Sequence, residues 1–236
     1  IKARAVINAT GIFSDDIRRM DEANASATIA WSQGIHIILD RSFLPGTHAI
    51  MVPKTEDGRV LFIIPWHNHV IVGTTDTPVK QAELEPVAFQ EELDFVMSHA
   101  AKYLTKDPKA EDVLSVYAGL RPLAKSNANA ATTAAISRDH IILVSDAGLV
   151  SVSGGKWTTY RHMAEDVVNR AIKVAGLDQR PCLTASMNLH GWTSAPNDEP
   201  FRVYGSDAAA LRELITEQPG WDQKLHPAYP YLVGEV

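Results

Sequence analysis

Residues 149–161 read LVSVSGGKWTTYR, a run typical of a buried strand that turns on a glycine pair into a helix. The next apolar residues fall at spacings of three and four, which predicts one face of that helix: Tyr160, Met163, Ala164, Val167, Val168 and Ala171. The first N–H groups of a helix have no intrahelical partner and favour an anionic ligand. We expect Gly155 to let such a ligand approach the backbone and Lys156 to place a cation beside it. The alternative is a tight strand–helix turn with an exposed lysine.

Two common phosphate-binding motifs are absent from the sequence. A P-loop would need a glycine where the chain has Val150, and a serine or threonine where it has Trp157. The dinucleotide fingerprint Gly-x-Gly-x-x-Gly does not occur either. A ligand at the glycine pair is therefore held by neither of these loops.

Length and composition narrow the class of protein. The 236 residues suffice for one large or two small domains, and a hydrophobic fraction of 45% can supply a core. A net charge of −6 argues against a nucleic-acid-binding protein. No apolar run reaches about 18 residues, so no membrane-spanning helix is predicted. The single Cys182 cannot form an internal disulfide, which suits a reducing cytosol.

The ends of the chain lead us to expect an excised piece of a longer protein. The sequence begins without an initiator methionine, inside an apolar run, and stops at Val236 without a terminating signal. Part of a binding site would then lie outside these residues.

Short β-branched runs predict strands at 35–39, 49–52, 60–64, 70–74, 113–118, 141–144 and 149–152, and residues 6–11 predict a short strand that ends in a Thr-Gly turn. Asp57 and Gly58 predict a hairpin, and His67 with Asn68 a second reversal, so we expect an antiparallel meander over 35–75. We expect residues 12–30 to be loop with a marginal helix. Amphipathic spacing predicts a helix whose apolar face comprises Leu93, Val96, Met97, Ala100, Ala101 and Leu104. A last helix is predicted over 207–216, with Ala210, Leu211, Leu214 and Ile215 on one face and Ser206 or Asp207 as its cap.

Three cations are candidates for binding a phosphate. Arg121 lies between the end of a predicted strand and Pro122, whose ring fixes the local backbone. Arg138 lies at the start of the next predicted strand, and Lys156 follows the glycine pair. Together they would suit a dianionic phosphate. Each could instead form a surface ion pair, as Arg138 could with the adjacent Asp139.

Histidines and hydroxyls supply further candidates. His36 lies in an alternating strand beside Gly34 and could be a base, a cofactor contact or a half-buried histidine. His67 and His69 could share one face of a strand, but no third ligand is close in sequence, so we predict no metal site. The segment 73–76, GTTD, could line a pocket with hydroxyls, that of Thr75 included, or cap the next segment of the chain.

Seven segments together carry a resemblance to a known family: 8–11 (NATG), 34–37 (GIHI), 62–66 (FIIPW), 73–76 (GTTD), 119–123 (GLRPL), 136–139 (ISRD) and 153–161 (SGGKWTTYR). Their order and approximate spacing resemble those of FAD-dependent glycerol-3-phosphate dehydrogenases, from near the first residue to about residue 175. Two departures are minor: the family often has Ser in place of Ile35, and Leu or Phe in place of Trp157.

The resemblance implies an activity. Glycerol 3-phosphate would lose a hydride from C2 to N5 of FAD and give dihydroxyacetone phosphate. Electrons would then pass to a membrane quinone, or to oxygen in the related oxidases.

The resemblance also implies roles for the candidate residues. It assigns catalytic roles to Lys156, Arg121 and His36, and substrate contacts to Arg121, Arg138, Lys156 and Thr75. The residues implied to contact FAD are Thr10, Gly11, Gly154, Gly155, Lys156, Trp157, Thr158 and Thr159.

The implied fold class is α+β, an α/β flavoprotein fragment with a mixed or antiparallel substrate-domain sheet, flanking helices and part of an FAD-binding fold. Residues 1–30 would be a remnant of the FAD-binding domain, and 131–180 its returning segment. Residues 31–130 would form the substrate domain, 181–205 a linker and 206–236 the truncated start of a C-terminal helical domain. Because the family's N-terminal dinucleotide fold is missing, we expect this piece alone to be inactive and free of FAD.

Partners and location are implied by the resemblance alone. It implies glycerol 3-phosphate as substrate, a quinone acceptor, a homodimer as one option, and a cytoplasmic protein peripheral to the inner face of the membrane. Two alternatives stay open. One is an amino-acid oxidase of the glycine or sarcosine type, and the other is a non-catalytic α+β interaction module.

Overall fold

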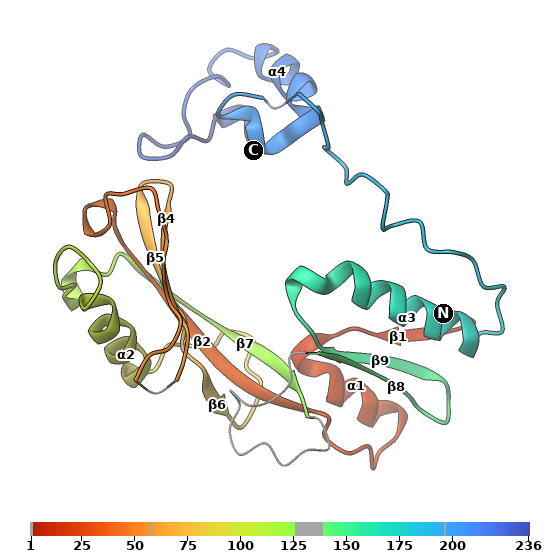
Figure 1. Cartoon of the computed structure of the whole chain (residues 1–236). Coiled ribbons are helices and arrows are strands. Elements are labelled where there is room, and N and C mark those ends of the chain that lie inside the picture. The colour runs from red at the N-terminus through yellow and green to blue at the C-terminus, as the bar shows by residue number, and fades with distance from the viewer. Residues whose placement is uncertain (1, 57, 126–138, 196) are drawn as a thin grey trace. The chain divides into compact units, whose positions relative to one another are not determined.

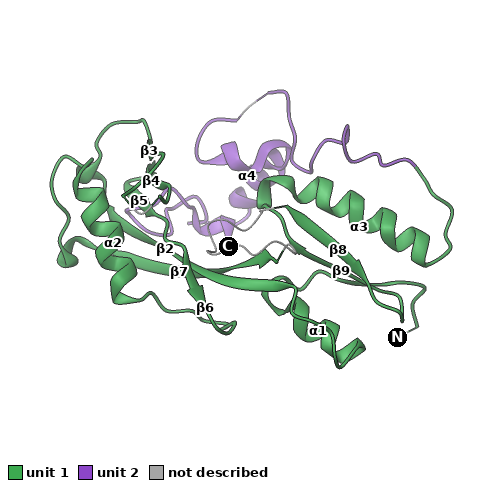
Figure 2. Cartoon of the chain, turned by 60° about the horizontal axis from the view of Figure 1, so that its bottom comes forward, with its two compact units in different colours: residues 1–180 green, residues 181–236 purple. Residues whose placement is uncertain are grey.

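The computed structural model describes residues 2–56, 58–125, 139–195 and 197–236. The chain divides into two compact units, residues 1–180 and residues 181–236 (Figure 2). The first unit contains two sheets, one of six strands and one of three (Figure 1). The expected mixture of helices with an antiparallel and a mixed sheet is therefore confirmed.

The six-stranded sheet is antiparallel throughout and is organised around its longest strand, β2 (Ile29–Asp40). Its strand order is β3-β4-β5-β2-β6, and β7 also pairs with β2. The other strands are β3 (Ile50–Val52), β4 (Leu61–Trp66), β5 (His69–Gly73), β6 (Thr77–Val79) and β7 (Ser115–Ala124). β5 pairs with residues 36–40 of β2, and β6 with residues 31–33. Because β7 pairs with residues 29–38, it must lie along the opposite edge of β2 from β5 and β6.

Helix α2 (Gln90–Ala101) covers one face of this sheet (Figure 1). Val96 and Ala100 are fully buried there, as the predicted helix face required. The strand side chains that meet them alternate along the chain, and they include Ile35, Ile37, Leu39, Leu61, Ile63, Val70 and Val72. The predicted reversal at His67 and Asn68 joins β4 to β5, whereas Asp57 of the predicted hairpin lies outside the described residues.

Two strands are longer than predicted. β2 begins at Ile29 rather than at residue 35, and β7 continues through Gly119 and Pro122 to Ala124. Arg121 therefore lies inside a strand, and the expectation that it follows a strand end is wrong. The reason is the ten-residue ladder with β2, in which Pro122 pairs with Trp31. Among the described strands β7 pairs only with β2, and an edge strand tolerates the missing N–H of proline.

The three-stranded sheet contains β1 (Val6–Asn8), β9 (Leu149–Gly154) and β8 (His140–Val144), in that order. β1 is parallel to β9, and β8 forms an antiparallel hairpin with it. Helix α1 (Ser14–Asp21) and helix α3 (Tyr160–Val174) lie on opposite sides of this sheet (Figures 1 and 2). α1 occupies the region expected to be loop with a marginal helix.

The predicted strand–turn–helix unit is therefore present as β9, the glycine pair and α3. Val167 and Ala171 of α3 are buried against Val150 and Val152, with Met163 packed beside them. Tyr160, Ala164 and Val168 are also predicted on this face, which is wrong, because all three are exposed.

The second unit contains α4 (Ala208–Thr216), preceded by a 3-10 segment, Phe201–Asp207. The predicted last helix is confirmed, and Asp207 is its N-cap residue, although its side chain makes no capping hydrogen bond. Ala208 and Ile215 are buried, whereas the predicted Ala210 and Leu214 are exposed. The predicted domain limits stay a prediction. None of the described helices has the length and apolar character needed to cross a membrane.

Candidate functional site

The first group of candidate residues comprises Arg121, His36 and Thr75. These residues lie near a gap in the six-stranded sheet, a short stretch of β2 that has no partner along one edge among the described strands. Residues 74–76 connect β5 to β6 along one edge of β2, so Gly34 and Ile35 of β2 face this connection instead of a strand. The N–H of Ile35 donates to Oγ1 of Thr75 at 3.0 Å. The hydroxyl of Thr75 thus takes the place of the missing strand partner. Thr75 is fully buried and its Oγ1 also donates to Glu92, so the expected contact of this hydroxyl with the substrate is wrong.

The side chain of Arg121 lies next to this gap, on the sheet face opposite α2. Arg121 is opposite Ser32 in the β2–β7 register, and its guanidinium extends across β2 over Gly34. Nη1 donates to the carbonyl oxygen of Thr75 at 3.0 Å, and Nη2 donates to Oγ1 of Thr74 at 3.0 Å. Since guanidinium offers five donors in a fixed plane, these two bonds orient it, and its charge and planar shape suit a ligand anion.

His36 lies on the same face of β2, two residues after Gly34. Its ring stacks on Tyr117 of β7, with centroids 5.0 Å apart and planes 12° apart. On its other side it lies against Gly73, where a Cβ would come within 2.3 Å of Cδ2 of the ring. Burial and, secondarily, the charge of Arg121 lower the pKa of His36 below its ordinary value. The imidazole is therefore neutral near pH 7 and can accept a proton.

A pocket of about 270 Å³ opens beside this histidine, on the sheet face opposite α2. It is lined by His36, Phe62, Ile64, Trp66, Ile71, Gly73, Thr74 and Tyr117. Its walls are mostly aromatic and aliphatic, so charges at its edge are screened less than in open water. Burial also raises the pKa of the Tyr117 hydroxyl, which stays protonated. Sequence reasoning missed Tyr117, although two-residue alternation back from Arg121 along one strand would have placed both on one face.

The second group of candidates lies at the carboxyl ends of β1 and β9. These strands are parallel, with Asn8 paired to Ser151, so Thr10 and Gly11 follow β1 where the glycine pair follows β9. Buried hydrogen bonds fix this edge: Asn8 Nδ2 donates to Ser151 Oγ at 3.1 Å and to the Ser14 carbonyl oxygen at 2.9 Å. The carboxyl edge of parallel strands is the usual ligand edge of α/β folds.

The glycine pair is required by packing as well as by conformation. Gly154 and Gly155 have φ angles of +77° and +81°. A Cβ at Gly155 would lie 2.4 Å from Sδ of Met163. The N–H of Gly155 donates to the Asp139 carbonyl oxygen at 3.3 Å. The expectation that Gly155 leaves its backbone open to a ligand is therefore wrong. Gly11, with φ +60°, is the open position, because no atom of the described residues lies within 4 Å of a Cβ built there.

Lys156 and the following three residues begin the helical segment. Lys156 is exposed, and its carbonyl oxygen accepts from the N–H and the Oγ1 of Thr159, both at 3.0 Å. Within the described part of the chain, the N–H groups of Trp157 and Thr158 have no acceptor, which fits an anion or a flavin ring edge. The indole of Trp157 is 87% exposed and stacks on Tyr160.

Strand β7 connects the two groups. A Cβ at Gly154 would lie 2.9 Å from Cβ of Ala124, the last residue of β7. Arg121 lies three residues earlier in that strand, about 10 Å away along the chain. The structure thus brings Arg121, His36 and Thr75 together, and it gathers Thr10 and Gly11 with residues 154–159. Arg138 lies outside the described residues.

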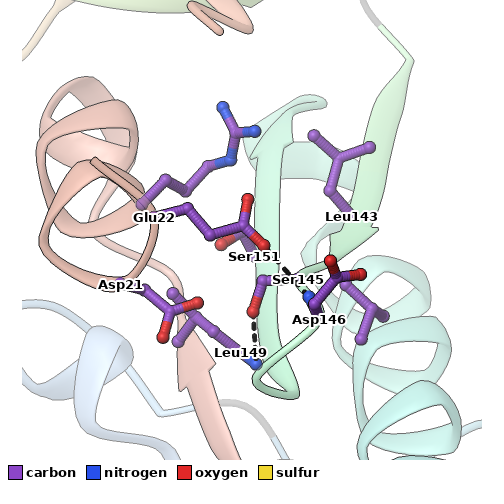
Figure 3. A pocket seen from close by; sticks show the side chains of 9 residues that line it. Asp21, Glu22, Leu143, Ser145, Asp146, Leu149 and Ser151 are labelled. Atoms are coloured by element: carbon purple, nitrogen blue, oxygen red, sulfur yellow. Dashed lines mark hydrogen bonds between the residues drawn. The ribbon is translucent and has the colours of Figure 1, made fainter. Parts of the chain in front are cut away.

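A separate hollow of about 260 Å³ lies between the end of α1 and the β8–β9 hairpin (Figure 3). Oε1 of Glu22 accepts from the N–H of Asp146 at 3.0 Å, and Oγ of Ser145 accepts from the N–H of Leu149 at 3.0 Å. None of the candidate residues lines this hollow. Its carboxylates suit a phosphorylated ligand poorly.

Comparison with known proteins adds independent findings. The family described as FAD dependent oxidoreductase matches residues 1–161. The chain is 39% identical over 221 residues to the mitochondrial glycerol-3-phosphate dehydrogenase of Mesocricetus auratus, which covers 92% of this chain and 30% of that protein. It is 38% identical over 261 residues to the probable mitochondrial glycerol-3-phosphate dehydrogenase of Caenorhabditis elegans, across 100% of this chain and 36% of that protein.

Among solved structures, the fold is similar to the glycerol-3-phosphate dehydrogenase of Bacillus halodurans complexed with FAD. The TM-score is 0.70 at 31% identity, over 92% of this chain and 40% of that one. The expected flavoprotein fold class is thereby confirmed. The chain spans about a third of the length of the curated relatives it matches.

Proposed function

The chain belongs to the family of FAD-dependent oxidoreductases, and from that premise we propose that the whole protein oxidises sn-glycerol 3-phosphate to dihydroxyacetone phosphate. The names of relatives that match nearly the whole chain support this substrate. The observation that carries the proposal is the oriented guanidinium of Arg121 next to the neutral imidazole of His36.

Each of these side chains has a part in the proposed reaction. Arg121 binds the substrate phosphate, because a planar guanidinium suits a dianionic oxygen group. A ring nitrogen of His36 accepts the proton of the C2 hydroxyl as the carbonyl forms. Thr75 holds the guanidinium through its carbonyl oxygen, and Lys156 and Arg138 complete the positive charge around the substrate.

The residues at the carboxyl edge of β1 and β9 fit a flavin dinucleotide. The open face of Gly11 allows close approach to the backbone, and the N–H groups of Trp157 and Thr158 are available as donors. Thr10, Gly11, Gly154 and residues 156–159 would hold FAD, whereas the Gly155 backbone faces Met163. When bound, FAD supplies the hydride acceptor that the side chains of this chain lack.

We also propose an electron acceptor and a location for the whole protein. Electrons pass on to a membrane quinone, and the protein is cytoplasmic and peripheral at the inner face of the membrane, with a homodimer as one option. These points rest on family resemblance, and the matched animal relatives carry mitochondrial names.

Substitution in the FAD-loaded whole protein tests the proposed site. We expect Arg121→Gln and Lys156→Met each to lower kcat/KM for glycerol 3-phosphate about 100-fold or more, because each removes a charge aimed at the reacting ligand. Lys173→Met, in the last turn of α3, is the matched control and leaves kcat/KM unchanged. If turnover survives both site substitutions, the cationic site has no catalytic role and an interaction module is favoured.

A further inference from the structure

Glu92 is a buried carboxylate to which the proposed function gives no part. It lies in the first turn of α2, on the face of the sheet opposite Arg121, and is only 3% exposed. Burial by itself raises the pKa of Glu92, but hydrogen bonds from Thr77, Gln33, Phe89 and Thr75 together lower it below its ordinary value. The group is therefore an ionised carboxylate beneath the sheet.

Backbone and side-chain donors from several segments converge on this carboxylate. Oε1 accepts from Oγ1 of Thr75 at 2.8 Å, and Oε2 accepts from Nε2 of Gln33 at 2.7 Å. Oε2 also accepts from the N–H of Phe89 at 3.1 Å. The last of these bonds is an ordinary helix N-terminal contact, whereas the other two tie α2 to β2 and to the gap at residues 74–76.

Thr75 connects the two faces of the sheet. Its hydroxyl points toward α2, where it donates to Glu92 and accepts from the N–H of Ile35. Its carbonyl oxygen points toward the other face, where it accepts from Nη1 of Arg121. A shift of Thr75 would therefore move both this carbonyl oxygen and the adjacent Thr74 hydroxyl, which are two of the contacts that orient the guanidinium.

We propose that Glu92 is a positioning residue for Arg121: it fixes Thr75, and through Thr75 it fixes the guanidinium over Gly34. The inference rests on the proposed function, because there Arg121 binds the substrate phosphate. Glu92 itself touches neither substrate nor cofactor. Its loss should weaken substrate binding more than the chemical step, since His36 and the FAD-binding edge are not among its contacts.

A comparison of matched variants of the FAD-loaded whole protein tests this role. Glu92→Gln keeps the shape of the side chain and removes its charge, and Glu91→Gln makes the same change at the exposed neighbouring position. We expect Glu92→Gln to raise KM for glycerol 3-phosphate about tenfold or more, with a smaller change in kcat, and Glu91→Gln to change neither. Equal values of KM in Glu92→Gln and Glu91→Gln would overturn the proposal.

A double-mutant cycle separates positioning from a general structural role. If Glu92 acts through Arg121, the variant carrying both Glu92→Gln and Arg121→Lys has the KM of Arg121→Lys alone. Fully additive effects on KM would overturn the positioning role while leaving the proposed function intact. If Arg121→Lys leaves KM unchanged, the proposed function fails, and the positioning role fails with it.

Variants of Thr75 provide the test if Glu92→Gln does not fold. Thr75→Val removes the hydroxyl link to Glu92 at nearly constant volume, and Thr75→Ser keeps that link. We expect Thr75→Val to raise KM for glycerol 3-phosphate, and we expect Thr75→Ser to have a KM near that of the wild-type protein. The same KM in both variants would overturn the proposal.

Discussion

The guanidinium of Arg121 occupies the space that a side chain at Gly34 would fill. A Cβ on Gly34 would come within 2.3 Å of Nη2 and 2.5 Å of Nη1. Because Gly34 has no side chain, the guanidinium of Arg121 can extend from β7 along the face of β2 and reach Thr74 and Thr75.

Gly34→Ala is therefore expected to impair function more than stability. The clash is with the end of a flexible side chain, so the arginine can move aside without disturbing the core. We expect kcat/KM for glycerol 3-phosphate to fall about 100-fold, with a change in unfolding free energy of about 1 kcal/mol or less. The measurements are steady-state kinetics and urea denaturation of the whole protein.

Gly119→Ala is the matched control for this prediction. Gly119 is paired with Gly34 across β2 and β7, and none of the residues that the structure describes comes within 4 Å of a Cβ built there. Gly119→Ala should therefore leave kcat/KM for glycerol 3-phosphate unchanged. Equal losses in both variants would show that a glycine in this ladder matters for some reason other than the space taken by Arg121.

The pKa of His36 should rise when the charge of Arg121 is removed. Burial is the larger cause of the lowered pKa, and the arginine is the second, so Arg121→Gln should recover part of the shift. NMR titration of the His36 ring protons measures this directly, with His36→Gln to assign the signal. Arg41→Gln, whose guanidinium bonds to the carbonyl oxygen of Gly46, should leave the pKa of His36 unaltered. An unchanged or lower pKa in Arg121→Gln would contradict the proposed coupling.

Gly11→Ala should weaken FAD binding without a special cost in stability. Gly11 and Gly176 have nearly the same φ, +60° and +59°, and at both positions the described part of the chain leaves open the space where a Cβ would go. Alanine at either position should therefore cost a similar strain, about 1–2 kcal/mol. Only Gly11 lies at the proposed FAD edge, so the dissociation constant of FAD, measured by fluorescence titration, should rise in Gly11→Ala alone. A similar rise in Gly176→Ala would point to a general effect of destabilisation.

Glu92 should stabilise the protein in a pH-dependent way. Its pKa in the folded state lies below the ordinary value of 4.5, so the folded state favours the ionised form. This contribution is full above that ordinary pKa and is lost as the pH falls through the folded pKa. The stability difference between wild type and Glu92→Gln should therefore shrink between about pH 6 and pH 3. Urea denaturation at several pH values, with Glu91→Gln as control, measures it, and a difference independent of pH would be inconsistent with an ionised Glu92.

Local patterns predicted much of the fold, because many elements are determined by their own periodicity. Val96 and Ala100 of α2, and Val167 and Ala171 of α3, are buried as their spacing predicts. β7 was predicted too short because Gly119 and Pro122 normally end strands. Its ladder with β2 outweighs that local preference, and such a ladder depends on residues about 85 positions earlier in the chain.

Two members of the site, Arg121 and His36, could be predicted from the sequence, but the residues that orient them could not. Arg121 and His36 are visible in sequence because an arginine next to a proline and a histidine two residues after a glycine are local patterns. Gly34, Gly73, Tyr117 and Glu92 act only through cross-strand register and through packing of α2, which no single segment encodes. Gly155 was assigned to ligand approach, yet Met163 of the following helix occupies the space beside it.

Anaerobic reduction of the flavin is the most direct test of the proposed activity. FAD-loaded whole protein is mixed with sn-glycerol 3-phosphate, glycerol or sarcosine, and loss of the oxidised-flavin absorbance is followed. We predict rapid loss with glycerol 3-phosphate, much slower loss with glycerol, and none with sarcosine. Loss of absorbance with sarcosine and not with glycerol 3-phosphate would contradict the proposal and assign the site to an amino acid.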